Sequence, residues 1–135
     1  MALTQTEAFT AVQGAVVGAL GVDEDEATAD ATLMDELGAE SIDLLDILFR
    51  IERLTGTRVQ AGDLANYIQG GMTDEEFGTE NDMVSAVGLA HLKTVMPQLD
   101  IDALVDSLPA EEVISHLTVA NLATIVTRYA AVPAG

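Results

Sequence analysis

Apolar residues recur at helical spacing near the start of the chain. Side chains three and four positions apart lie on one face of an α-helix, which predicts a helix whose inner face carries Phe9, Val12, Val16 and Leu20. Thr4 and Glu7 have the spacing of a capping box, in which each side chain accepts a hydrogen bond from the other residue's backbone N–H. Because glycine commonly ends helices, we expect this helix to stop at Gly21.

Residues 21 to 40 lack this periodicity, and we interpret them as a long loop with a short turn near residues 32 to 34. The acidic run at residues 23 to 26 raises the question of calcium. Counted from Asp23, however, the EF-hand pattern has Ala27 at a ligand position, Thr28 in place of the glycine and Met34 in place of the bidentate Glu. The run is therefore interpreted as a solvated loop.

A second helix is predicted from Ser41 to the glycine at Gly56. Its apolar positions cover more than one face: Ile42, Leu45, Ile47, Leu48, Phe49, Ile51 and Leu54. A surface helix of a small domain normally buries one stripe, so some of these side chains should point outward. This favours a docking surface on the second helix.

Residues 57 to 108 contain several local helix signals. Helices are expected over about 63 to 68, 85 to 96 and 101 to 108, with breaks at Gly70-Gly71 and Pro97 and a second capping box at Thr73 and Glu76. A structureless connection of this length would be improbable inside a compact domain. We therefore expect the region to have helical structure of its own.

Pro109 suits the first position of a helix that continues through residues 111 to 114. Thr118 can cap a last helix whose inner face carries Val119, Leu122, Ile125 and Val126. The tail at residues 133 to 135 is expected to be loose. No segment has the alternation of a strand, so the sequence predicts an all-α protein, with residues 1–135 forming a single domain.

The charge of the chain narrows its possible partners. It has 23 acidic residues against 5 basic ones, a formal net charge of −18. Nucleic acids and anionic membrane surfaces attract clustered cations, so neither is expected as a partner. A basic protein surface is the natural partner. The alternative is that acidity merely keeps a small protein soluble.

The chain has no Cys, which excludes disulfides and thiolate chemistry. No apolar run approaches the roughly 18 residues of a membrane span. The N-terminus carries no basic residues of the kind that begin a signal or transit peptide. We therefore expect a cytoplasmic protein.

The segment from Leu37 to Asp46 reads Leu-Gly-Ala-Glu-Ser-Ile-Asp-Leu-Leu-Asp. It resembles the acyl carrier protein family, whose signature is Leu-Gly-x-Asp-Ser-Leu followed by an acidic and apolar helix. Residues 31 to 37 are similar to the family's lead-in, and residues 117 to 122 to the start of its last helix. Glu40 and Ile42 replace the usual Asp and Leu but keep charge and apolarity. The resemblance covers residues 4 to about 60 and about 109 to 130, which leaves about 61 to 108 as an insertion.

The resemblance implies a four-helix bundle of the acyl carrier protein type, here with an additional helical insertion. It implies that a phosphopantetheinyl transferase attaches a phosphopantetheine arm to Ser41. The chain would then hold an acyl intermediate as a thioester and present it to acyl-loading and acyl-transferring enzymes of fatty-acid, lipid or related biosynthesis. It would catalyse nothing by itself, and we expect a monomer.

The residues around Ser41 give independent support. A helix N-terminus favours a phosphate because its backbone N–H groups are free and its dipole is positive. His91 and His116 are far away in sequence, and no Gly-x-Ser-x-Gly elbow surrounds Ser41, so attachment fits better than nucleophilic catalysis. The competing interpretation is that Ser41 only caps the helix. Neither lone histidine indicates a metal site.

A partner-docking surface is expected beside Ser41. Glu40, Asp43 and Asp46 would form its acidic rim, because Asp43 and Asp46 share a helix face. The resemblance implies that this helix docks on basic patches of partner enzymes. The remaining predicted docking residues are Ile42, Leu45, Phe49 and Arg50, and the last of these departs, with Arg53, from the family's more uniformly acidic helix. The alternative for Phe49 is an ordinary core position.

Two other functions stay open. The arm could carry an aminoacyl, peptidyl or polyketide intermediate in place of a fatty acyl chain. The chain could instead be an unmodified acidic adaptor that uses the second helix for binding alone. The apolar residues of the insertion also have alternative roles: they could pad the core, widen the acyl pocket or form a surface for a partner. These residues are Leu64, Tyr67, Ile68, Leu89, Leu92 and Val95.

Overall fold

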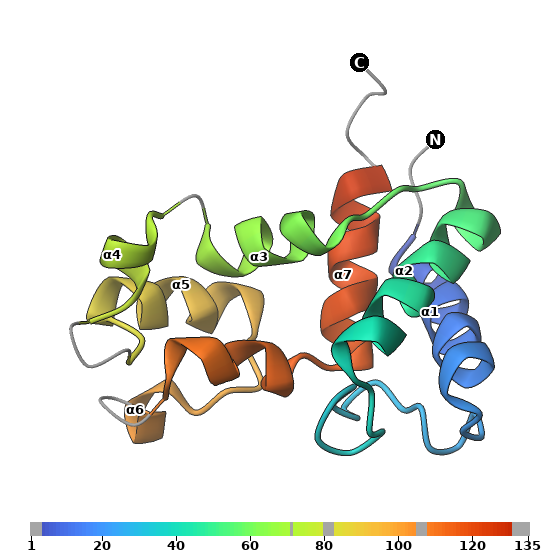
Figure 1. The fold of residues 1–135 in the computed structure, drawn as a ribbon, viewed down its shortest axis with the longest axis horizontal. Coiled ribbons are helices and arrows are strands. Elements are labelled where there is room, and N and C mark those ends of the chain that lie inside the picture. Colours follow the sequence, from blue (N-terminus) through green and yellow to red (C-terminus); the bar gives the residue numbers. More distant parts are fainter. Residues whose placement is uncertain (1–3, 71, 80–82, 105–107, 131–135) are drawn as a thin grey trace. The chain divides into compact units, whose positions relative to one another are not determined.

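The computed structural model describes residues 4–70, 72–79, 83–104 and 108–130. Within them the chain forms helices joined by loops, with three isolated β-bridges and no strand (Figure 1). The elements are α1 (Gln5–Leu20), α2 (Ser41–Thr55), α3 (Ala61–Gln69), α4 (Asp74–Phe77), α5 (Ala86–Val95), α6 (Ile101–Leu104), the 3₁₀ helix η1 (Ala110–His116) and α7 (Val119–Ala130). The all-α prediction is confirmed.

The chain divides into two compact units. Unit 1 comprises residues 1–61 and 115–135, and unit 2 comprises residues 62–114. The insertion expected at about 61 to 108 falls almost entirely in unit 2. The single domain of residues 1–135 stays a prediction, because a division into units does not decide whether the two parts fold independently.

In unit 1, α1 packs against both α2 and α7 (Figure 1). The predicted capping box begins α1: the N–H of Thr4 donates to Glu7 Oε1 at 3.0 Å, and the N–H of Glu7 donates to Thr4 Oγ1 at 3.1 Å. Gly21 ends the helix with a φ of +70°, a conformation that glycine adopts without strain. Of the four residues predicted for the inner face, Val12 and Val16 are fully buried, whereas Phe9 and Leu20 are half-buried.

Helices α2 and α7 bury apolar stripes whose members recur every three or four residues. In α2 the stripe consists of Leu44, Ile47, Leu48 and Ile51. Removing each large side chain of this kind from water contributes about 1.5–3 kcal/mol. In α7 the buried face includes Val119, Leu122, Ile125 and Val126, and Thr118 caps it by accepting the N–H of Asn121 at 3.1 Å.

The long loop between α1 and α2 is tied to the start of α7. The N–H of Leu33 donates to the carbonyl of Leu117, and the N–H groups of Val119 and Ala120 donate to the carbonyls of Ala31 and Ala29, each at 3.0 Å. A helix start has backbone N–H groups without acceptors inside the helix, and the loop supplies two of the missing acceptors. The segment before Ser41 is thereby held by a distant part of the chain.

Unit 2 contains most of α3 and the whole of α4, α5 and α6. Helix α5 contacts both α4 and α6. The predicted capping box at Thr73 begins α4, with hydrogen bonds of 3.2 Å in both directions between Thr73 and Glu76. The start of α5 lies close to the chain after α4, because a Cβ on Gly88 would lie only 2.9 Å from the carbonyl oxygen of Phe77.

Several expectations for residues 57 to 116 need adjustment. The helix expected over 101 to 108 is observed only as Ile101–Leu104, and residues 105–107 lie outside the described residues. The helix expected to start at Pro109 is a 3₁₀ helix, Ala110–His116. Of the apolar residues named for the insertion, Leu64, Ile68, Leu89 and Leu92 are buried, whereas Tyr67 and Val95 are half-buried. The tail at 133 to 135 also lies outside the described residues.

None of the helices in the described part of the chain combines the length and the apolar character that a membrane crossing requires.

Candidate functional site

The predicted site lies where the long loop of unit 1 meets α2. Ser41 is the first residue of α2, as the sequence predicted, although its side chain lies outside the described part of the structure. Its neighbours Glu40 and Ile42 are both exposed, the latter with 72% of its surface accessible. A large modifying enzyme can therefore reach the backbone at this point.

The loop holds Ser41 in place through a compact turn. The N–H groups of Leu37 and Gly38 donate to the carbonyls of Thr32 and Met34, and the N–H of Ala39 returns to the carbonyl of Leu33 at 2.9 Å. Gly38 has a φ of +75°, which explains why a glycine precedes the site. Leu33 and Ala39 are buried, so the turn is anchored in the core of unit 1.

The N-terminus of α2 carries acidic side chains. Asp43 Oδ2 accepts the N–H of Glu40 at 2.9 Å, which places a carboxylate at the positive end of the helix dipole. A free phosphate would have to compete with this carboxylate for backbone N–H donors. A phosphodiester that is covalently joined to a serine needs no such affinity, so the residues present fit a covalent phosphate group better than a bound phosphate ion.

An exposed apolar stripe runs along α2 from the site. Ile42, Leu45 and Phe49 are 72%, 54% and 57% exposed, respectively, and their spacing places them on one helix face. The outward-facing surface expected from the sequence is therefore present. The core interpretation of Phe49 is wrong, because the buried face of α2 is complete without it.

Cations border the far end of this stripe. The guanidinium of Arg53 lies 5.8 Å from the centre of the Phe49 ring, within the range of a cation–π contact. Arg50 Nε donates to Asp46 Oδ1 at 3.1 Å, an i, i+4 ion pair on the surface of α2. Within the acidic rim predicted from Glu40, Asp43 and Asp46, Asp46 is therefore neutralised by an ion pair, whereas Asp43 accepts only a backbone N–H, that of Glu40.

Sequence reasoning missed Gly18 of α1. A Cβ at this position would lie 2.7 Å from Arg50 Nη1, so the guanidinium of Arg50 occupies space that the glycine leaves open. Nothing in the local sequence of α1 indicates this contact, because it depends on how α1 and α2 pack.

The two histidines were not assigned a function. His91 Nε2 lies 2.9 Å from the carbonyl oxygen of Tyr67, and its ring fills the space beside Gly70, where a Cβ would lie within 2.8 Å of three ring atoms. This is a packing role inside unit 2. His116 is half-buried at the end of η1. Among the described residues, no group of three or more acidic or histidine side chains is arranged to hold a metal ion.

Comparison with known proteins places this geometry in a family. A family model described as a phosphopantetheine attachment site matches residues 10–68. The acyl carrier protein of Thermotoga maritima is 34% identical over 84 residues, which cover 62% of this chain and 91% of the relative. The chain belongs to the acyl carrier protein family.

A second acyl carrier protein, from Petrotoga mobilis, is 37% identical over 62 residues, or 46% of this chain and 73% of the relative. Membership gives the chain an acyl carrier role, a covalent phosphopantetheine as its prosthetic group, and partner enzymes that include a phosphopantetheinyl transferase. The fold agrees with an acyl-carrier-like bundle that has additional helices.

Proposed function

We propose that Ser41 is the residue that carries the phosphopantetheine arm. Three observations support this choice: Ser41 begins α2, its immediate neighbours are exposed, and it lies within the matched residues 10–68. The position of Ser41 at the start of α2 carries the proposal, because it puts a hydroxyl-bearing residue at an accessible helix start. The bound arm supplies a flexible tether with a terminal thiol, which holds an acyl group as a thioester.

The chain itself performs no catalysis in this proposal. Neither histidine is assigned as a base: His91 belongs to unit 2 and is engaged with the carbonyl of Tyr67, and His116 is half-buried at the end of η1. The role of the protein is to keep Ser41 on a rigid turn and to bring the tethered acyl group to its partners at high effective concentration.

We further propose that the exposed stripe of α2 is the docking surface for these partners. The surface, defined by Glu40, Ile42, Asp43, Leu45, Asp46, Phe49 and Arg50, has three parts. An acidic part at the helix start suits a basic patch on the partner, because opposite charges speed association and fix orientation. An apolar part, Leu45 and Phe49 above all, suits a hollow that can bury it.

The third part is Arg50, and Arg53 lies next to the surface at its far end. Asp46 is already paired with Arg50, so it offers a partner less charge than Asp43 does. The basic patch of the partner should therefore be centred near Glu40 and Asp43 and should not extend as far as Arg53. This graded charge orients a partner with its active site toward Ser41.

The acyl cargo in this proposal is an intermediate of fatty-acid, lipid or related biosynthesis. Support comes from the naming of both relatives as acyl carrier proteins and from the aliphatic core of unit 1. The proposal keeps the monomeric state and the cytoplasmic location that the sequence led us to expect.

Peptide mapping of the intact protein tests the proposal. The full chain is co-expressed with a phosphopantetheinyl transferase, digested and sequenced by mass spectrometry. We expect one phosphopantetheine, located on the peptide that contains Ser41, and an acyl group on its thiol in material purified without reductant. Finding the group on Ser85 or another serine would contradict the assignment.

A further inference from the structure

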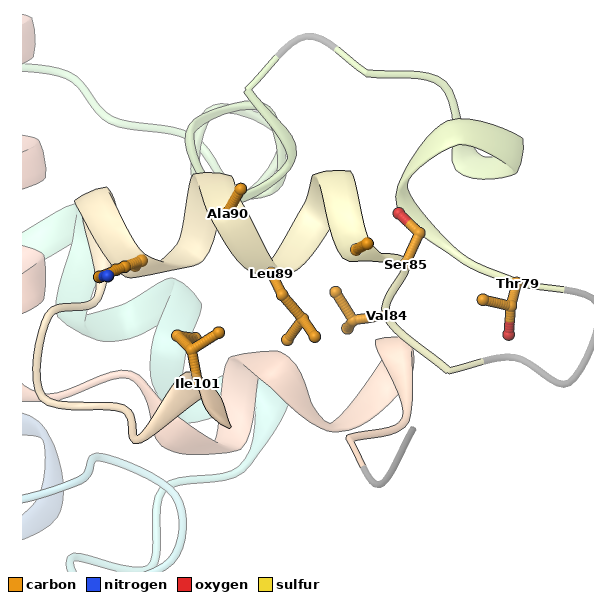
Figure 2. A pocket seen from close by; sticks show the side chains of 8 residues that line it. Thr79, Val84, Ser85, Leu89, Ala90 and Ile101 are labelled. Atoms are coloured by element: carbon orange, nitrogen blue, oxygen red, sulfur yellow. The ribbon is translucent and has the colours of Figure 1, made fainter. Parts of the chain in front are cut away.

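Unit 2 contains a cavity that the carrier function does not explain. Its volume is about 330 Å³. It is lined by Thr79, Val84, Ser85, Ala86, Leu89, Ala90, Lys93 and Ile101. Figure 2 shows the side chains of Val84, Leu89 and Ile101 converging on one space beside α5. At about 30 Å³ for a water-sized group, the volume has room for about ten non-hydrogen atoms.

The floor of the cavity is apolar, and its rim is exposed. Val84 and Leu89 are only 3% and 4% exposed, whereas Ala86, Ala90 and Lys93 lie at the surface. Residues 86, 89, 90 and 93 follow the i, i+3, i+4, i+7 pattern, so one face of α5 forms a wall from the floor to the surface. The cavity is therefore partly open to solvent, with exposed residues of α5 at its rim.

The hydroxyl groups on the cavity wall already have partners. Ser85 Oγ donates to the carbonyl of Glu76 and accepts the N–H of Gly88, and Thr79 Oγ1 accepts the N–H of Met83. A ligand inside the cavity therefore meets a surface that offers mainly hydrocarbon contacts. This favours an aliphatic chain over a sugar or a nucleoside, which need several polar partners.

Lys93 gives one end of the cavity a distinct charge. It is the single Lys or Arg between residues 62 and 114, a region that holds eleven Asp and Glu residues. Among the described residues, its ammonium group has no ion-pair partner. The cavity therefore combines an apolar floor with an unpaired cation at its rim, in a unit whose other charges are negative.

We propose that this cavity binds a linear aliphatic chain that ends in an anionic group, with the chain against Val84, Leu89 and Ile101 and the anion at Lys93. The site goes beyond the carrier function and does not depend on Ser41. Lys93 is the one charged residue among those that line the cavity, and charges more than about 8 Å from it are largely screened at 0.15 M salt. Lys93 therefore gives a ligand with an anionic end group an advantage over one with a neutral end group.

Methyl NMR of the full chain at 0.15 M salt tests this with two probes, octanoate and 1-octanol. We expect octanoate to shift the methyl signals of Leu89 and Ile101, with a Kd on the order of 1 mM for a ligand of this size. Lys93→Gln should weaken octanoate about two- to fivefold, as expected for an exposed ion pair, and leave 1-octanol unchanged. Arg58→Gln, which removes a cation from unit 1, is the matched control and should change neither.

A second pair of variants tests the cavity itself. Ala90→Phe adds volume at a lining position, whereas Val87→Phe adds volume at a position of α5 that is 63% exposed and does not line the cavity. We expect the first variant alone to lose octanoate binding, with both spectra showing a folded protein. The proposal is overturned by octanoate shifts confined to unit 1, by equal binding to both phenylalanine variants, or by an equal response of both probes to Lys93→Gln.

Discussion

The two units of the chain use their few cations in comparable ways. Unit 1 has four arginines and twelve acidic residues, and Arg50 and Arg53 border the exposed stripe of α2. Unit 2 has one lysine and eleven acidic residues, and Lys93 borders the apolar cavity. In both units a cation stands beside apolar surface that is accessible from outside.

The units differ in what that surface is suited to bind. The stripe in unit 1 lies on an exposed face of α2, beside the proposed attachment residue Ser41, so it suits the surface of another protein. The cavity in unit 2 is concave and holds about 330 Å³, so it suits a small molecule. Our two proposals together give a division of tasks, with carrier function in unit 1 and ligand binding in unit 2.

The largest effects are expected when a buried core side chain is truncated in one unit at a time, which tests this division of tasks. Ile51 and Leu92 are both fully buried, in α2 and α5 respectively. Replacing either residue with Ala should cost about 2–5 kcal/mol of unfolding free energy, because it leaves a cavity. We expect Ile51→Ala to impair phosphopantetheine loading at 37 °C and Leu92→Ala to leave it close to normal.

Chemical denaturation with loading measured in parallel reports both effects. Leu92→Ala provides the control for Ile51→Ala, because each removes a buried aliphatic side chain of the same number of carbons. Loss of loading in both variants would show that the units do not act separately.

Charge reversal on the docking surface should have a smaller effect. Asp43→Lys places a cation at the start of α2, where the proposed partner surface is basic, and should slow loading by the transferase about three- to tenfold at low salt. Glu75→Lys changes the net charge of the chain by the same amount in unit 2 and should leave the rate unchanged. Stopped-flow or quenched-flow rates across a salt series distinguish local docking from a general charge effect, which would slow both variants alike.

The smallest predicted effect concerns the capping box at the start of α1 and the way the melting temperature depends on pH. The backbone N–H of Thr4, and then its hydroxyl, lower the pKa of Glu7 below its ordinary value of 4.5. A carboxyl with a lowered pKa stabilises the fold fully above its unfolded pKa, and this contribution is lost as the pH falls through the folded pKa. Glu7→Gln should therefore reduce the melting temperature slightly at pH 7, and this difference should fade as the pH falls through the folded pKa of Glu7.

Thermal melts followed by circular dichroism, repeated from pH 7 downward, test whether the stability difference between Glu7→Gln and the unmodified sequence shrinks as the pH falls. Glu24→Gln, in the exposed loop, removes a similar charge outside the capping box and is the matched control. A constant difference between Glu7→Gln and the unmodified sequence at every pH would contradict the assignment to this carboxylate.

The parts of the fold that depend on neighbouring residues could be predicted from the sequence. The capping boxes at Thr4 and Thr73, the positive-φ stop at Gly21 and the start of α2 at Ser41 each follow from a few adjacent positions. The signature around Ser41 identified the family for the same reason. These features need no knowledge of the tertiary structure.

Features that join distant residues could not be predicted. The hydrogen bonds between the loop before Ser41 and the start of α7 connect positions more than 80 residues apart. The place of Arg50 beside Gly18 and the exposure of Phe49 follow from the way α1 packs on α2. The cavity of unit 2 likewise depends on the meeting of α5 with α6, for which the sequence contains no motif.

The central claim is that Ser41 alone carries the prosthetic group. Intact-mass measurement of the full chain, Ser41→Ala and Ser85→Ala, each co-expressed with a phosphopantetheinyl transferase, tests it most directly. Ser85 is the matched control because it also lies at the start of a helix, as the N-cap of α5. The account predicts one phosphopantetheine on the full chain and on Ser85→Ala and none on Ser41→Ala, which should remain folded. A folded Ser41→Ala protein that still gains the group would contradict it.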